Sequence, residues 1–308
     1  MNKFWWFIAF LACLVILNNH FRIIAFSCIT DAEEGTIRLM TYNTNGVAGD
    51  YMDEKFANDF LSAIDSICPQ VLVLQEMSKG YSPYLCEELQ KRYPYNSQSE
   101  LSKTKERNQR VACLFSMYPI RGFYRFKYNK QEIDSIYKGS FKKNKNYYSS
   151  PDIFNSVIDI DGRETLLVCC YLKTNDYSKL RNEHSENWFH GLKDYFSGYR
   201  MASCVRSLNA KMIRDSIAKY NLPTIVCGDM NDFQFSRPVK TIMGDDLKNV
   251  WWERGMGYGM TYNKYHLMLR IDHILYSKEF EPVSVYVPHL RFSDHYPIVT
   301  DLYFILDN

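Results

Sequence analysis

The fold is decided by the stretch TIVCGDMND at residues 224–232. Its first four residues are β-branched or apolar and follow Pro223, which is typical of a short, buried strand. The composition then changes to a glycine, an acid, an amide and a second acid. Rigid scaffolds often present functional groups at the ends of such strands. The stretch therefore predicts a sheet with a functional site where Asp229 and Asn231 follow the buried strand.

Three other strand candidates also carry polar groups at one end. They are the segments LVLQE at 72–76, RIDH at 270–273 and FSDHYP at 292–297. Taken singly, Glu76 fits a helix cap, and an Asp-His pair such as Asp272-His273 occurs by chance. Taken together, acids that converge without a cation would repel one another and raise each other's pKa. A bound metal ion relieves that conflict, so we expect one at these strand ends.

The predicted ligands define the kind of metal and the kind of reaction. Oxygen ligands without a cysteine cluster favour a hard cation, Mg²⁺ first, with Mn²⁺ or Ca²⁺ as substitutes. Mg²⁺ commonly uses only one or two carboxylates, so the remaining acids are free to orient water and to support a histidine. Such an ion binds phosphate oxygens, and this division of roles is typical of phosphoryl-transfer chemistry.

Strand and helix patterns alternate along the chain from residue 37. The predicted strands are 37–43, 71–74, 111–115, 123–128, 153–160, 166–172, 224–227, 271–276, 283–287 and 298–305, and the predicted helices are 53–67, 85–92 and 201–220. Asp161-Gly162 marks a hairpin between two of the strands. Hairpins mixed with helices predict an α/β fold with two packed, mostly antiparallel sheets covered by helices on both sides. Two polar segments, 127–150 and 176–198, are expected to be insertions at the rim.

Length and composition bound the domain organisation. The 308 residues, 46% of them hydrophobic, fit one large domain plus a terminal extension. The 37 Lys and Arg nearly balance the 35 Asp and Glu, so no global field attracts the protein to a polyanion. The 9 cysteines show no CxxC pair, which disfavours a disulfide scaffold and a metal finger.

The N-terminus predicts a separate segment. An uncharged run at 4–17 is followed by a polar break and a second apolar stretch at 23–29. The first run has the length of a signal-peptide core and is short of the ~20 residues that span a bilayer, although 4–29 could span if the break is tolerated. We expect residues 1–34 to be a signal or membrane anchor with a linker. Residues 35–308 would then form a catalytic domain outside the cytoplasmic membrane, at the cell envelope.

Five motifs, in order along the chain, resemble those of the endonuclease/exonuclease/phosphatase family. They are Thr41-Tyr42-Asn43, Leu74-Gln75-Glu76, Gly228-Asp229-Met230-Asn231-Asp232, Arg270-Ile271-Asp272-His273 and Ser293-Asp294-His295-Tyr296-Pro297. That family includes DNase I-like nucleases, abasic-site endonucleases, neutral sphingomyelinases and inositol polyphosphate 5-phosphatases. The resemblance covers the chain from about residue 37 to its end. It implies a four-layer α-β-β-α sandwich with the site at one end of the paired sheets.

The resemblance also implies a set of metal ligands. Glu76 would be the principal ligand of Mg²⁺ or Mn²⁺, with Asn43 and Asp294 nearby in its shell. Asp232 is expected to act as a helix or turn cap at least as readily as a catalytic group. Arg270 is expected to pair with a core acid rather than with phosphate.

The catalytic groups follow from the same resemblance. Asp229 would orient or deprotonate the attacking water, and Asn231 would hold the phosphoryl oxygens. His295 would stabilise the charge that develops on the phosphate, with Asp272 fixing its tautomer. Tyr171 stands where many members have a histidine. A phenol that donates a hydrogen bond to phosphate fits there, as in abasic-site endonucleases, and so does weakened catalysis.

The substrate is left open by the sequence. The segment 127–150 is rich in Lys and Tyr, residue types that bind nucleic-acid backbone and bases or an anionic lipid surface, although a solvated loop is the simpler interpretation. Three hypotheses therefore remain: a nuclease, a hydrolase of phospholipid or another small phosphoester, and a catalytically silent binding protein. The protein is expected to be a monomer.

Overall fold

The structure is a computed structural model that describes residues 29–45, 54–77, 83–97, 110–127, 152–175, 188–264 and 267–305. The Lys/Tyr segment, from residue 128 on, and most of the predicted N-terminal segment lie outside these residues. None of the helices in the described part is long and apolar enough to cross a membrane.

Two mixed six-stranded sheets form the centre of the molecule. The first has the strand order β13-β14-β1-β2-β4-β3, and the second has the order β5-β6-β7-β8-β12-β9. Each sheet contains one parallel pair, β1 with β2 and β7 with β8, and its other pairs are antiparallel. The strands of the first sheet are β1 (Ile37–Asn43), β2 (Val71–Met77), β3 (Tyr95–Asn96), β4 (Val111–Ser116), β13 (Phe280–Tyr286) and β14 (Ile298–Phe304). Those of the second are β5 (Ile120–Arg125), β6 (Asp152–Ile160), β7 (Arg163–Tyr171), β8 (Thr224–Asp229), β9 (Leu247–Asn249) and β12 (Asp272–Ser277).

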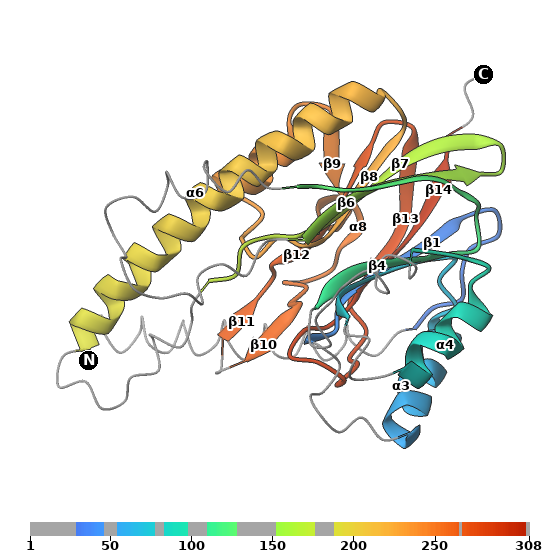
Figure 1. Ribbon diagram of the computed structural model, residues 1–308, viewed down its shortest axis with the longest axis horizontal. Helices are drawn as coiled ribbons and strands as arrows, with labels where there is room; N and C mark the ends of the chain where they lie inside the picture. Colours follow the sequence, from blue (N-terminus) through green and yellow to red (C-terminus); the bar gives the residue numbers. More distant parts are fainter. Residues whose placement is uncertain are drawn as a thin grey trace, which may run out of the picture.

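Helices cover the outer face of each sheet. Helices α3 (Glu54–Ile67) and α4 (Pro83–Arg92) lie on the first sheet, and α6 (Trp188–Tyr220) lies on the second (Figure 1). The short α7 (Arg237–Met243) packs against α6 and β9 on the same side. The short α8 (Val250–Arg254) and the ribbon of β10 (Tyr262–Lys264) and β11 (Leu267–Leu269) complete the described elements.

Three apolar clusters hold these layers together. Leu39, Val73, Leu167, Ile225 and Ile274 belong to a cluster that fills the space between the two sheets. A second cluster joins α3 and α4 to the first sheet, and a third joins α6 and α7 to the second. Both faces of each central strand thus pack against a buried layer. This burial on both sides explains why the strands are nearly continuously apolar in sequence. The predicted four-layer α-β-β-α sandwich with two mixed sheets is confirmed.

The predicted hairpin is present and has the expected turn. Asp161 and Gly162 have φ of 53° and 86° and connect β6 to β7. Positive φ at both central residues defines the turn that matches the twist of the flanking strands.

Several local predictions were wrong or incomplete. Helix α6 begins at Trp188 and not at the predicted position 201, so residues 188–198 of the expected insertion are helical. The predicted strand 123–128 lies instead at 120–125, where a bulge between Ile120 and Gly122 shifts its pairing with β6. Helices α7 and α8 and strands β3, β9, β10 and β11 were not predicted. These strands have only 2 or 3 residues, and the helices have 7 and 5, which is less than two helical turns, so none of them shows a hydrophobic period.

Candidate active site

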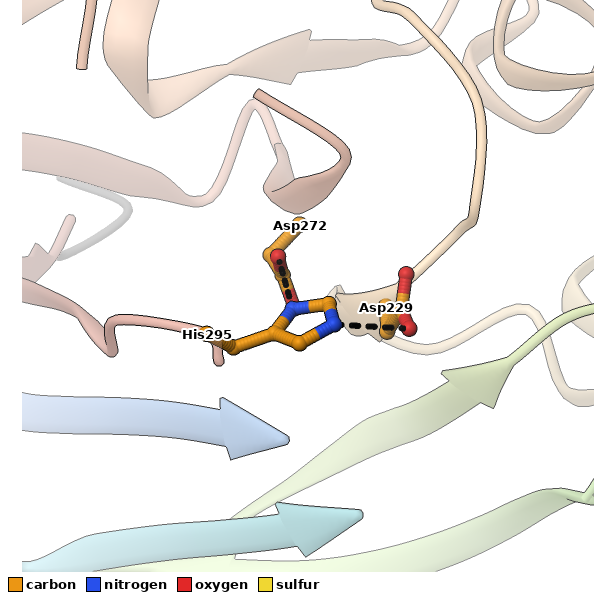
Figure 2. Close-up of side chains that lie close together, drawn as sticks. All are labelled: Asp229, Asp272 and His295. Atoms are coloured by element: carbon orange, nitrogen blue, oxygen red, sulfur yellow. Dashed lines mark hydrogen bonds and ion pairs between the residues drawn. The ribbon is translucent and has the colours of Figure 1, made fainter. Parts of the chain in front are cut away.

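Three buried side chains meet at one end of the paired sheets. Asp229 ends β8, and Asp272 begins β12 directly opposite it in the antiparallel register. His295 comes from the segment before β14, and its Nδ1 lies 2.9 Å from Asp272 Oδ2 (Figure 2). On the other side of the ring, Nε2 lies 3.8 Å from Asp229 Oδ2. The imidazole is therefore held between two carboxylates.

A glycine near the end of β8 allows this strand to lie close to β7 beside Asp229. Gly228 has a φ of 128°, and a Cβ atom at this position would lie 2.1 Å from the carbonyl oxygen of Cys170 on β7. No other residue fits such a position without moving the backbone. Gly228 thus allows β7 and β8 to stay paired up to Asp229.

The Asp229 carboxylate is fixed by amides on both of its oxygens. The backbone N–H of Asn231 donates to Oδ1 at 2.8 Å, and Asn231 Nδ2 donates to Oδ2 at 2.9 Å. Asn231 Nδ2 also donates to the carbonyl of Leu172 at 3.1 Å. Asn231 has a left-handed backbone with a φ of 52°, which asparagine tolerates better than most residues. In this geometry Asn231 positions Asp229.

Asn43 and Glu76 bring the first sheet into the site. Asn43 Nδ2 donates to Glu76 Oε1 at 3.1 Å and to Asp229 Oδ2 at 2.9 Å, so a single amide links the carboxylates of both sheets. Glu76 has a φ of 55° and lies within the irregular pairing between Leu74 and Met77, where β2 departs from β4. Such a bulge changes the direction of a side chain, and here the Glu76 side chain points toward Asn43.

The electrostatics of this end of the sandwich favour positive charge. Burial and the charge of Asp272 raise the pKa of Asp229 to about 7. Burial lowers the pKa of His295, but Asp272 and Asp229 outweigh it and raise that pKa to about 10. Imidazolium is therefore the favoured form of His295 between the two acids. The carboxylates exceed the positive charge available from the ring, as expected for a site that takes up a cation.

Tyr171 lies beside these acids as a neutral phenol. It is opposite Asp229 in the parallel register of β7 and β8, and its hydroxyl is 3.3 Å from Thr174 Oγ1. Burial, followed by the negative charge of Glu76, raises the pKa of Tyr171 well above its usual range. The phenol thus keeps its proton and can donate a hydrogen bond.

Two cationic side chains contact carboxylates that were expected to bind metal. Arg110 Nη1 forms an ion pair with Glu76 and donates to Asn45 Oδ1 at 2.9 Å. Lys264 Nζ lies 2.7 Å from Asp294 Oδ2. The structure therefore brings Glu76 and Asn43 together, while the Asp294 carboxylate is engaged by Lys264. No sequence pattern indicated Arg110 or Lys264, since a single charge beside a strand is normally solvated.

A second buried cluster supports the loop after β8. Arg206 Nε binds Asp232 Oδ2 at 2.9 Å, and Tyr199 Oη donates to Asp232 Oδ1 at 3.0 Å. Asn175 Nδ2 donates to the carbonyl of Asn231 at 3.0 Å, and its Oδ1 accepts from Arg206 Nη1 at 2.9 Å. The Asp232 carboxylate also accepts from the backbone N–H of the next residue, Phe233. The helix that follows, α7, is capped by Ser236 and not by Asp232. These residues position the site.

Arg270 departs from expectation. Its side chain is buried, and no carboxylate among the described residues pairs with it, so the expected core acid is absent from that part of the chain. Nη1 is buried and has no hydrogen-bond partner in the described ranges, and the guanidinium lies over the Trp251 ring at 5.5 Å from its centroid. Burial lowers the pKa of Arg270 to about 10.

The fold and this end of the sheets define an α/β sandwich of the DNase I-like class. Residues 206–295 match the model of the Endonuclease/Exonuclease/phosphatase family, and this match supports a phosphoester hydrolase of the nuclease or phosphatase kind. The resemblance to that family is thereby confirmed. No curated protein matches the sequence significantly.

Solved structures share the fold at low sequence identity. The human Nocturnin catalytic domain with bound sulfate has a TM-score of 0.56 and 16% identity over 89% of this chain and 96% of that one. An endonuclease/exonuclease/phosphatase family protein from Bacteroides thetaiotaomicron has a TM-score of 0.59 and 14% identity over 90% and 100%. D. rerio TDP2 complexed with a single-strand DNA product has a TM-score of 0.56 and 14% identity over 87% and 99%.

Proposed function

We propose that this protein is a divalent-metal-dependent hydrolase of phosphoester bonds, with Mg²⁺ as its cofactor and Mn²⁺ as a substitute. The observation that supports it most strongly is the array of Asp229, His295 and Asp272, with Glu76 linked to Asp229 through Asn43. Such an array combines a proton acceptor, a cationic donor and a carboxylate for metal, which are the groups that phosphoester hydrolysis requires.

The residues present fit a hard cation. Glu76 offers carboxylate oxygens at the end of β2, and Asn43 holds Oε1. The raised pKa of Asp229 reflects an excess of negative charge that a divalent cation would relieve. We expect Glu76 to hold the metal, with Asn43 beside it and Asp294 contributing once its pair with Lys264 opens. When bound, the cation neutralises charge on phosphoryl oxygens.

The protein's own groups divide the remaining chemistry. Asp229, with a pKa of about 7, is suited to take a proton from the attacking water near neutral pH. His295 carries a positive charge toward the phosphate, and Asp272 fixes its orientation by accepting from Nδ1. Tyr171 donates from its phenol, and Asn231 holds Asp229 and is proposed to contact phosphoryl oxygens as well.

Nucleic acid is the substrate class we favour. Phe235 and Trp252, which are 65% and 44% exposed, stack on each other with ring centroids 5.7 Å apart. Phe235 is in the loop that follows Asn231 and Asp232, and exposed aromatic rings of this kind stack with bases. The D. rerio TDP2 complex with a DNA product is compatible with this choice. Phospholipid headgroups and a silent binding role remain the alternatives.

Residues 1–34 are proposed to anchor or secrete the domain, which would act as a monomer at the cell envelope. The apolar runs 4–17 and 23–29 support this proposal. Membranes from cells that express the full chain are extracted with alkaline carbonate. Retention of the full-length protein in the membrane pellet would favour an anchor, and release of a shortened protein would favour a cleaved signal.

The hydrolase proposal is tested with the fragment that begins near Gly35. Bis-p-nitrophenyl phosphate, DNA, RNA and sphingomyelin are each offered with Mg²⁺, with Mn²⁺ and with EDTA. Metal-dependent turnover that disappears in His295→Ala and in Glu76→Ala is the expected result, and the preferred substrate separates nuclease from lipid hydrolase. No turnover of any substrate with either metal would reject the hydrolase in favour of the binding protein.

A further inference from the structure

Lys264 is a cationic side chain with no role in the proposed chemistry. It is the last residue of β10, and its Nζ lies 2.7 Å from Asp294 Oδ2. The Lys264 side chain is 38% exposed, whereas that of Asp294 is only 16% exposed. The carboxylate is thus the more buried partner, and the ammonium is the one that solvent reaches.

The Asp294 carboxylate acts on the candidate active site. Asp294 directly precedes His295, whose ring lies between Asp272 and Asp229. Burial lowers the pKa of His295, these two aspartates raise it, and the charge of Asp294 raises it further. An ammonium held on this carboxylate therefore lies beside the charges that are proposed to bind metal and phosphate.

Backbone contacts hold Lys264 next to this segment. Asn263 N donates to the carbonyl of Asp294 at 2.8 Å. Tyr262, one residue earlier, forms an isolated β-bridge with His295, and the centroids of their rings are 4.9 Å apart. The main chain of β10 is thus tied to the site, while the long, flexible side chain of Lys264 can change its partner.

The pair between Lys264 and Asp294 is weak enough to open. An ion pair that solvent reaches contributes about 0–1 kcal/mol, because water competes for both groups. Asp294 is also one of the proposed metal ligands, and a divalent cation attracts a carboxylate more strongly than an ammonium does. Coordination by Asp294 would therefore release Lys264 close to the bound cation.

We infer that Lys264 is a phosphate-binding residue of this site, which Asp294 holds in the metal-free protein and which contacts a phosphate group of the substrate when Asp294 coordinates the metal. The inference rests on the proposed function, since it names a contact of the phosphoester substrate. A lysine ammonium is a compact charge with three donors, so it binds phosphate oxygens without one fixed geometry. Substrate then binds best after the metal, because Asp294 engages the ammonium until that point.

Calorimetry with Mn²⁺ tests the competition at Asp294 without turnover. Lys264→Met should bind Mn²⁺ up to about fivefold more tightly than the wild type, since the metal no longer has to displace the ammonium. Lys264→Gln should do the same, and it replaces the methionine variant if that variant does not fold. Lys91→Met is the matched control, because it breaks a surface pair with Glu88 at 2.6 Å and should leave Mn²⁺ affinity unchanged. Mn²⁺ affinity that is not raised in either Lys264 variant would overturn the inference.

Binding of inorganic phosphate tests the contact with the substrate. Tm is measured in saturating Mg²⁺ while phosphate replaces chloride at constant ionic strength. The rise in Tm with phosphate should be smaller in Lys264→Met than in the wild type and should be intact in Lys91→Met. In EDTA, where Asp294 holds the ammonium, wild type and Lys264→Met should respond alike. Equal responses of these two proteins in Mg²⁺, including no response, would overturn the inference and leave Lys264 as a counter-ion of Asp294.

Kinetics separate this inference from the hydrolase proposal. On a substrate that the wild type hydrolyses, loss of a charged hydrogen bond should raise KM about tenfold in Lys264→Met, with kcat changed much less. Lys264→Arg keeps the charge and should recover part of this loss. A wild type that hydrolyses nothing but shows a Lys264-dependent response to phosphate in Mg²⁺ would reject the hydrolase and keep the phosphate contact. Turnover with an unchanged KM in Lys264→Met would do the reverse.

Discussion

Arg38 and Arg270 are both buried, but their surroundings differ completely. Arg38, near the start of β1, donates from Nε and Nη2 to the two oxygens of Asp301 at 2.7 and 2.8 Å and from Nη1 to the carbonyl of Ile67 at 3.0 Å. No acid among the described residues pairs with Arg270 in this way. The Asp301 hydrogen bond raises the pKa of Arg38, whereas burial lowers that of Arg270. Charge is thus balanced within the protein at the start of β1.

At the other end of β1, the buried charges are carboxylates and they are not balanced within the protein. There Asn43 touches Glu76 and Asp229, and Asp229 and Asp272 share the single positive charge of His295. A buried charge that is fully paired contributes to one fixed fold, whereas a buried charge left short of partners is available to a ligand. The following predictions separate these two kinds of buried charge.

Asp229→Asn should have the largest effect. It removes the proposed proton acceptor, so kcat should fall by about 10²–10⁴-fold. Stability of the metal-free protein should fall slightly, because either orientation of the new amide turns its NH2 group toward an N–H donor of Asn231 or Asn43. Turnover and urea unfolding on the same preparations check both parts. Full activity in Asp229→Asn would show that another group accepts the proton.

Asp301→Asn should affect stability and leave the chemistry unchanged. It leaves Arg38 buried without its acid, and breaking such a pair costs about 3–5 kcal/mol. Chemical denaturation measures this loss, and kcat per folded molecule should match the wild type. A loss under 1 kcal/mol would mean that Arg38 finds water or another acceptor, and it would remove the contrast with Arg270.

The sequence predicts the site better than its surroundings. Asp229, Asp272 and His295 are visible because each stands where an apolar run changes to polar residues, a purely local signal. The partners that decide whether a charge is balanced are remote: Arg206 is 26 residues from Asp232, and Arg38 is 263 residues from Asp301. Arg270 was therefore expected to have a core acid that the described residues do not provide.

Short elements were also hidden for a physical reason. Helix α8 and strand β9 together cover 247–254, and their conformation follows from packing on β12 and β13 rather than from a period in their own sequence. Long strands such as β1 show their alternation and were predicted with correct bounds.

Asp272→Asn should weaken catalysis and move its alkaline limit. The pKa of His295 is about 10 because the charges of Asp272 and Asp229 outweigh burial. A group with a raised pKa keeps its proton below that pKa and loses it as pH rises through it. Removing the Asp272 charge lowers the pKa of His295, so the alkaline limb of the kcat profile should move to lower pH.

The size of the effect at neutral pH is about 10- to 100-fold in kcat, as for other residues that orient a catalytic group. A pH series of kcat for wild type and Asp272→Asn gives both quantities. An alkaline limb at the same pH in both proteins would show that His295 does not act as the charged donor.

Arg110→Ala should have the smallest effect: Mn²⁺ should bind more tightly, while the metal-free protein should become slightly less stable. Arg110 is paired with Glu76 but is 41% exposed, so the pair contributes only about 0.2–1 kcal/mol. Because its guanidinium occupies the carboxylate expected to hold metal, its removal should tighten Mn²⁺ binding by up to about fivefold, as measured by calorimetry. Unfolding stability without metal should fall slightly. Arg121→Ala, which breaks the exposed pair with Asp159, is the matched control and should leave Mn²⁺ affinity unchanged. Equal Mn²⁺ affinity in wild type and Arg110→Ala would show that Arg110 does not compete with the cation for the Glu76 carboxylate. Asp229 would then be the next candidate for the metal ligand.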